Sequence, residues 1–170
     1  MALAQQHGLR VIEDAAHAPG AVLDEKALGT WGEIGCFSFF SNKNLSTGEG
    51  GMLITDNDTI AEKVRLLRSH GMTSLTWDRH KGHAYTYDVV DLGYNYRLDE
   101  VRSALGLVQL NKLRVNNARR QHLTEKYWQS LAGLGLGLPF QRTGSLGTPS
   151  YHIFPILLPK DVDRLRFIDS

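Results

Sequence analysis

The feature that most constrains the fold is an apolar run that ends in a cation and a glycine-rich turn. Residues 34–40 are almost all apolar, with Ser38 as the polar exception, and Lys43 follows three residues later. The glycine-rich segment 48–51 (GEGG) then closes the loop. A short apolar run bounded by turn signals is typical of a buried strand. The pattern therefore predicts a strand that presents one amine at the edge of a sheet.

Two further strands are predicted beside this one. Residues 9–13 form a short apolar run between helical patterns, which predicts a buried strand in parallel pairing. Residues 52–55 form another run directly after the glycine-rich turn. The link of about ten residues before this third strand is too short for a helical crossover, so we expect the third strand to run antiparallel to the second.

Helical patterns surround these strands. Residues 1–8 are typical of the end of a helix that is closed by Gly8. Residues 58–69 form an amphipathic pattern, and Asp56 or Asn57 can serve as its N-cap. Residues 98–131 predict a long helix with a small, apolar and therefore buried first half, and a more exposed second half.

The remaining segments have weaker patterns. Residues 22–31 and the glycine-containing residues 133–147 are predicted to be connections, and residues 151–158 are predicted to be a strand. Residues 161–170 begin an amphipathic helix. Because a predicted element is interrupted at each end of the chain, we expect the chain to be the middle part of a longer fold.

Composition argues against several classes of function. The chain has 170 residues, 42% of them hydrophobic, and a net charge of +1, which is typical of a soluble globular domain. This balance indicates no basic face for nucleic acid or for an anionic membrane. No apolar stretch reaches the roughly 20 residues of a transmembrane helix. Cys36 is the single cysteine, so we expect a reducing, cytoplasmic location and a plain packing role for this side chain.

Asp14 ends the predicted strand that precedes Lys43 along the chain. An acid in this place often caps the following helix, but it can also face a pyridine nitrogen and keep that nitrogen protonated. Lys43 is either a solvated surface group or a partly buried amine that can form an imine. An amine and a carboxylate at the ends of neighbouring strands are the two groups that pyridoxal phosphate needs most.

Two more side chains are candidates by position. Ser38 can bond to the backbone or hold a phosphate oxygen. His17 follows Asp14 by three residues, so both can face the same way on one helical turn. No third ligand is in reach, so we predict no metal site. The glycine-rich segment alone leaves a phosphate-binding α/β module open, although Asp14 would repel a phosphate there.

Four blocks of sequence, in this order, resemble the sugar aminotransferases of the DegT/DnrJ/EryC1/StrS family. They are residues 11–18 (VIEDAAHA), residues 37–51 with FSF, KN and GEGG, residues 66–71 (LLRSHG), and residues 93–97 (GYNYR) with 104–113 (ALGLVQLNKL). The resemblance covers nearly the whole chain and implies an α/β fold. That fold is part of the large domain of the type I pyridoxal-phosphate transferases, with three strands of a mixed sheet and flanking helices. Residues 1–115 would be the C-terminal half of that domain, and residues 116–170 the connecting helix and the beginning of the small domain.

The resemblance also implies a role for each candidate residue. Lys43 would form an imine with pyridoxal phosphate and then move the substrate proton, while Asp14 would pair with the pyridine nitrogen. His17, where many relatives have glutamine, would lie next to the phenolic oxygen, and Ser38 would bind the phosphate. Asn95 would reach the phosphate of the neighbouring subunit's cofactor, which implies a homodimer with shared sites.

The implied reaction moves an amino group from glutamate or glutamine to a nucleotide-linked keto-sugar, in amino-sugar and polysaccharide biosynthesis. Some relatives are dehydratases with histidine in place of the lysine, and Lys43 argues against that branch. A non-catalytic or regulatory homologue stays open. Family members are much longer, so we expect residues 1–170 alone to bind pyridoxal phosphate weakly and not to transaminate.

Substrate contacts are harder to predict. The long loop 72–93 has no clear period, and its Trp77, Arg79 and His83 are candidates for contacts with the sugar. His152 is either a structural histidine of the predicted strand 151–158 or a residue that faces the site.

Overall fold

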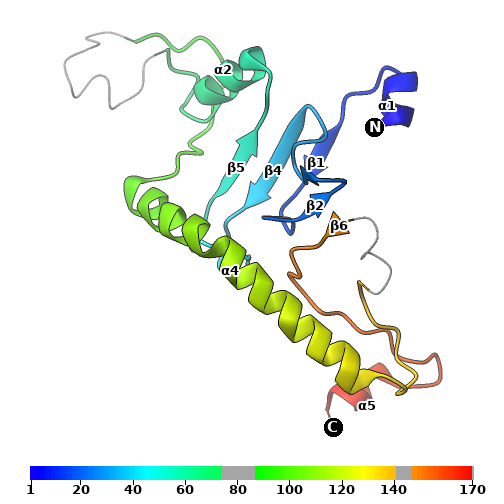
Figure 1. Cartoon of the computed structure of the whole chain (residues 1–170). Helices are drawn as coiled ribbons and strands as arrows, with labels where there is room; N and C mark the ends of the chain where they lie inside the picture. Colours follow the sequence, from blue (N-terminus) through cyan, green and yellow to red (C-terminus); the bar gives the residue numbers. More distant parts are fainter. Residues whose placement is uncertain (74–86, 141–146, 170) are drawn as a thin grey trace.

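Three strands form the central sheet of the protein (Figure 1). Strand β1 (Ile12–Asp14) pairs in parallel with β4 (Ile34–Ser38), and β4 pairs in antiparallel with β5 (Gly51–Ile54). The three predicted strands and both directions of pairing are therefore confirmed. This architecture is that of a computed structural model, which describes residues 1–73, 87–140 and 147–169.

The predicted burial of the first strand is wrong. Ile12, at the start of β1, is 67% exposed, because in the described residues β1 has a pairing partner on one side only. The buried core is small and lies beyond β4, where Phe39, Leu45 and Leu113 pack together with the partly buried Phe37.

A second small sheet has the strand order β3-β2-β6. It consists of β2 (Val22–Leu23), β3 (Lys26–Ala27) and β6 (Gly147–Thr148), all in antiparallel pairing. The sequence predicted only connections here. Asp24 and Glu25, with φ of 46° and 62°, form a tight hairpin turn in which both central residues are left-handed. Such a turn usually contains glycine. The turn of Asp24 and Glu25 contains none, so the hairpin was not predicted from the sequence.

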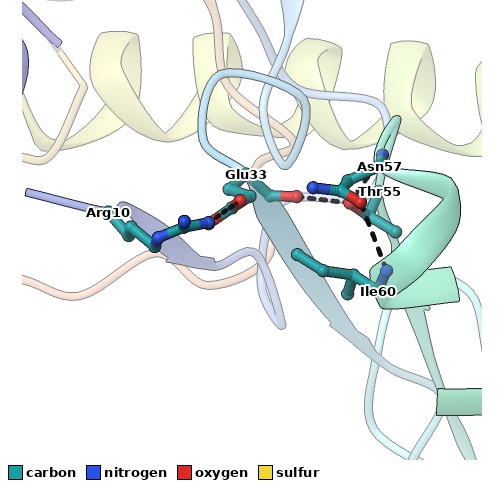
Figure 2. Close-up of polar contacts among 5 residues, drawn as sticks. All are labelled: Arg10, Glu33, Thr55, Asn57 and Ile60. Carbon is teal, nitrogen blue, oxygen red and sulfur yellow. Dashed lines mark hydrogen bonds and ion pairs between the residues drawn. The ribbon is translucent and has the colours of Figure 1, made fainter. Parts of the chain in front are cut away.

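Polar contacts join the beginning of β1 to the end of β5 (Figure 2). Arg10 forms an ion pair with Glu33, just before β4. The Thr55 hydroxyl donates a hydrogen bond to the Glu33 carbonyl oxygen at 2.6 Å, and the Asn57 backbone N–H donates to the Thr55 hydroxyl at 3.1 Å. These contacts connect the chain segments that flank the three strands, at the end of the sheet opposite the Lys43 turn.

Helix α2 (Asp58–Leu67) begins at Asn57, whose Oδ1 accepts the backbone N–H of Ile60 at 3.3 Å. Asn57, and not Asp56, is therefore the N-cap. After the helix, His70 and Gly71 adopt φ of 61° and 68°, which ends it where the sequence predicted.

Helix α4 (Glu100–Leu131) has 32 residues and is about 48 Å long. Its predicted bounds are confirmed, but its predicted burial is wrong. In the apolar first half, Leu107 is 65% exposed and Leu113, close to the middle of the helix, is the one buried residue, whereas Thr124 is buried in the second half. A sheet of three strands about 4.8 Å apart is several times narrower than α4 is long, so it cannot cover the whole helix. The helix is continuous through residue 115, so the predicted domain division lies inside it.

Two short helices lie near the chain ends, α1 (Ala2–Gln6) and α5 (Arg164–Ile168), and both agree with the predicted helical patterns. The predicted strand at 151–158 is not formed among the described residues, where a single bridge joins Leu157 to Gly137. Tyr151 has a φ of 51°, which breaks an extended segment. No helix within the described ranges has the length and apolar character needed to cross a bilayer.

Candidate active site

Asp14 and Ser38 lie at the same edge of the central sheet, because each is the last residue of one of two parallel strands. Asp14 is paired in register with Cys36, two residues before Ser38. The Asp14 side chain is exposed, and its Oδ1 accepts the backbone N–H of Ala16 at 3.0 Å. Within the described residues Oδ2 has no hydrogen bond, so this oxygen can accept the N–H of a ligand.

Lys43 lies in the turn that follows β4. Its backbone N–H donates to the Phe40 carbonyl oxygen at 3.0 Å, and its side chain is half-buried. No ion pair engages its amine in the part of the chain that the structure describes. The Ser38 hydroxyl accepts the Phe40 backbone N–H at 3.3 Å, which leaves the hydroxyl hydrogen able to donate to a ligand.

His17 lies in the turn after β1. The prediction that Asp14 and His17 share one helical turn is wrong, because Asp14 is still in the strand and no helix follows it. The ring of His17 instead lies against His152, with 4.2 Å between the ring centroids. His152 therefore belongs to the surroundings of the loop that carries His17, although the sequence left this open.

Asn44, the residue after Lys43, is the centre of a polar network. Its side chain is almost fully buried, with 6% of the residue exposed. Its Nδ2 donates to the Ser150 carbonyl oxygen at 2.7 Å and to Asn117 Oδ1 at 3.0 Å. Its Oδ1 lies 2.9 Å from His152 Nδ1. Every hydrogen-bonding atom of the Asn44 amide is therefore used.

The network also reaches the loop after β1. Asn117 Nδ2 donates to the Pro19 carbonyl oxygen at 2.9 Å, and the Ser150 hydroxyl donates to the His17 carbonyl oxygen. Sequence reasoning did not identify Asn44, Asn117 or Ser150 as site residues. The one signal available was the position of Asn44 next to Lys43 in a matching block.

Burial is the main reason why the pKa of His152 lies below its usual value, and the nearby His17, Lys43 and Arg120 lower it further. The neutral imidazole is therefore favoured at this position. The described residues contain no group of three or more histidine, cysteine or acidic side chains that could hold a metal ion.

Asn95 belongs to the segment between α2 and α4. Its backbone forms a bridge with Ser69, a fully buried residue at the end of α2, and its side chain is exposed. No hydrogen bond links Asn95 to Asp14 or Lys43 in the described ranges. The other predicted substrate contacts, Trp77, Arg79 and His83, lie outside the described residues.

Comparison with known proteins identifies the family of this chain. The model of the DegT/DnrJ/EryC1/StrS aminotransferase family matches residues 1–169. The chain belongs to this family. Two of the relatives of this DegT/DnrJ/EryC1/StrS chain are described next, and each shares more than a third of its residues. A UDP-N-acetyl-3-dehydro-alpha-D-glucosamine 3-aminotransferase of Acidithiobacillus ferrooxidans is 42% identical over 155 residues, 91% of this chain and 38% of that protein.

A second relative is the spore coat polysaccharide biosynthesis protein SpsC of Bacillus subtilis. It is 38% identical over 156 residues, 91% of this chain and 40% of SpsC. Among solved structures, Helicobacter pylori PseC, an aminotransferase involved in the biosynthesis of pseudoaminic acid, superposes with a TM-score of 0.82 at 30% identity. That match covers 94% of this chain and 41% of PseC.

The DegT/DnrJ/EryC1/StrS chain thus spans about two fifths of the length of these relatives. The α/β architecture expected from the family resemblance, a part of the pyridoxal-phosphate transferase fold, is confirmed by the structural match.

Proposed function

We propose that this chain forms part of a pyridoxal-phosphate-dependent sugar aminotransferase. The enzyme would move an amino group from glutamate or glutamine to a nucleotide-linked keto-sugar, in the synthesis of an amino sugar for a polysaccharide. The observation that carries the proposal is the meeting of Asp14, Ser38 and the Lys43 turn at the ends of two adjacent parallel strands. The relatives' printed activities support the class of substrate.

The residues present fit pyridoxal phosphate. Asp14 offers a carboxylate oxygen without a hydrogen bond in the described part of the chain, which suits the N–H of a pyridinium ring. The Ser38 hydroxyl can donate to a phosphate oxygen. The half-buried amine of Lys43 has no carboxylate partner among the described residues, so it can react. His17, in the loop beside Asp14, would lie near the phenolic oxygen.

Each residue then has a defined task. Bound pyridoxal phosphate supplies an electron-poor ring that takes up the electron pair released when a substrate C–H bond breaks. Asp14 would keep the ring nitrogen protonated by holding a negative charge beside it. Lys43 Nζ would take the proton from the substrate carbon and return it to a second position. Ser38 would fix the phosphate and so the orientation of the ring.

We further propose that the working enzyme is a cytoplasmic homodimer. Because Asn95 is exposed and has no hydrogen bond to Asp14 or Lys43 in the described residues, its side chain is available for a contact with the cofactor of a second subunit. A homologue without turnover is the alternative. The presence of Lys43, whose amine has no ion pair in the described residues, counts against that alternative.

The test is a labelling experiment on the full-length protein. After incubation with pyridoxal phosphate, borohydride reduction should attach the cofactor to the peptide that contains Lys43. Lys43→Arg should abolish the label, and Lys112→Arg, on the exposed side of α4, should keep it. With nitrogen-15 glutamate and a nucleotide-linked keto-sugar, the wild-type protein should transfer the isotope and Lys43→Arg should not. Label on Lys43 without isotope transfer to any nucleotide-linked keto-sugar would support the non-catalytic alternative, and label elsewhere would contradict both.

A further inference from the structure

Two paths of hydrogen bonds connect the loop that carries Lys43 to the loop that follows Asp14. The first runs from the Asn44 amide to Asn117 on α4 and from there to the Pro19 carbonyl oxygen. The second runs from the same amide to the backbone of Ser150, whose hydroxyl bonds to the His17 carbonyl oxygen. Both paths start at Asn44, which has no other hydrogen-bonding atom to offer.

The donor and the acceptor of each hydrogen bond in this network can be assigned from the backbone carbonyl oxygens at which the two paths end. Backbone carbonyl oxygens only accept, so the atom of Asn44 that faces Ser150 must be its NH₂ group, and the atom of Asn117 that faces Pro19 must be its NH₂ group as well. Asn117 then presents its oxygen to the second N–H of Asn44. The remaining atom of Asn44 is the carbonyl oxygen, and it faces His152 Nδ1.

This orientation decides the tautomer of His152. An amide oxygen can only accept, so Nδ1 of the ring must carry a proton. In the neutral imidazole the other nitrogen, Nε2, is then an acceptor. The groups around this ring are His17, Lys43 and Arg120, and none of them brings a negative charge that would favour a second proton.

We propose that Asn44 is a positioning residue of the active site, which fixes the Lys43 turn relative to the Asp14 loop and holds His152 in the Nδ1–H form. This inference rests on the proposed function, because that function assigns Lys43 its task. Asn44 touches no reacting atom in this scheme. It acts through Asn117, Ser150 and His152, which come from α4 and from the chain beyond it.

Asn44→Asp is the informative variant, because it keeps the shape of the side chain. It removes both donors, places one oxygen against two acceptors, Asn117 Oδ1 and the Ser150 carbonyl oxygen, and adds a negative charge beside His152. The matched control is Asn42→Asp. Asn42 is the exposed residue on the other side of Lys43, so the control adds the same charge next to the same lysine without touching the network.

The first measurement is nitrogen-15 NMR of the histidine rings in the full-length protein, without substrate. We expect wild-type His152 and the Asn42→Asp control to show a protonated Nδ1 and an unprotonated Nε2 at neutral pH. In Asn44→Asp the ring should be doubly protonated. If wild-type His152 carries its proton on Nε2, the proposal is overturned, and this result needs no variant to fold.

The second measurement is turnover. A misplacement of a catalytic group by about 1 Å can cost on the order of 100-fold in rate, so kcat of Asn44→Asp should fall about 100-fold with little change in KM. Asn42→Asp should keep the wild-type rate. If Asn44→Asp does not fold, Asn117→Ala should lower kcat instead, since it breaks the first path. A normal kcat in the folded variant would contradict the proposal. Absence of transfer by the wild-type protein would contradict the proposed function, while the NMR result still tests the role of Asn44.

Discussion

The imidazole rings of His17 and His152 lie with their centroids 4.2 Å apart and their planes tilted by 39°. One ring follows strand β1 and the other belongs to the C-terminal part of the chain. Because burial, His17 and the cations Lys43 and Arg120 lower the pKa of His152, the folded state prefers the neutral ring.

The stability of the protein should therefore depend on this ring in mildly acidic solution. A depressed pKa contributes stability above the unfolded value of about 6.5, and this contribution is lost as the pH falls through the lower folded value. We expect His152→Gln to flatten the fall in the free energy of unfolding between about pH 7 and pH 5. Urea unfolding at a series of pH values checks this. His122→Gln, at an exposed position of α4, is the control and should keep the wild-type profile.

Glu13 stabilises the turn between β3 and β4. Its two carboxylate oxygens accept the backbone N–H groups of Gly29 at 2.8 Å and Gly32 at 2.7 Å. Burial raises the pKa of Glu13, but the N–H groups of Gly32, Gly29 and Trp31, with Lys26, outweigh it and leave the pKa below its usual value.

Glu13→Gln should destabilise the protein by about 1–2 kcal/mol near neutral pH, because the amide can accept only one of the two bonds. The difference should begin to shrink below about pH 4.5, where the unfolded carboxylate takes up a proton, and should be lost as the pH falls through the lower pKa of the folded state. Chemical denaturation at both pH values measures it. An equal loss for Glu62→Gln, at an exposed position of α2, would show that the effect is one of net charge.

The cap of α2 allows a prediction that separates two adjacent residues. Asn57→Ala removes the acceptor of the Ile60 N–H and should cost about 1 kcal/mol of stability. Asp56→Ala should cost little, since no cap bond involves that side chain in the described residues. Thermal unfolding of the two variants side by side decides whether the cap is assigned correctly.

Mixed dimers test the role proposed for Asn95. If Asn95 acts on the partner's cofactor, subunits with Lys43→Ala mixed with subunits with Asn95→Ala should form dimers in which one of the two sites is intact. Activity should then return on mixing, although each variant alone is inactive. If Asn95 acts within its own subunit, every site in the mixture keeps one defect and no activity returns. Exchange of subunits is verified by mass spectrometry of the mixed dimer.

Local sequence signals predicted the elements that depend on local chemistry. The apolar runs predicted the three central strands, and the short link predicted the antiparallel pairing of β5. The Asx residues and glycines predicted the ends of α2. The bounds of α4 followed from its uninterrupted helical pattern.

Contacts between distant residues were not predictable in the same way. The exposure of Leu107 depends on how far the sheet extends, which the helix's own pattern does not encode. The loss of the strand at 151–158 follows from the left-handed backbone of Tyr151, a residue type that rarely adopts it. The Asn44 network joins residues up to 133 positions apart, and Asn44 and Ser150 are separated by 106 positions, so no local sequence pattern could predict it.

That separation has a consequence for how the protein is made. Asn44 leaves the ribosome 106 residues before Ser150, so at a synthesis rate of about 5–20 residues per second the turn beside Lys43 waits roughly 5–20 s for its anchor. During this interval of translation the turn that carries Lys43 lacks its hydrogen bond to Ser150. Premature termination before Ser150 would leave that loop unsecured for the lifetime of the polypeptide.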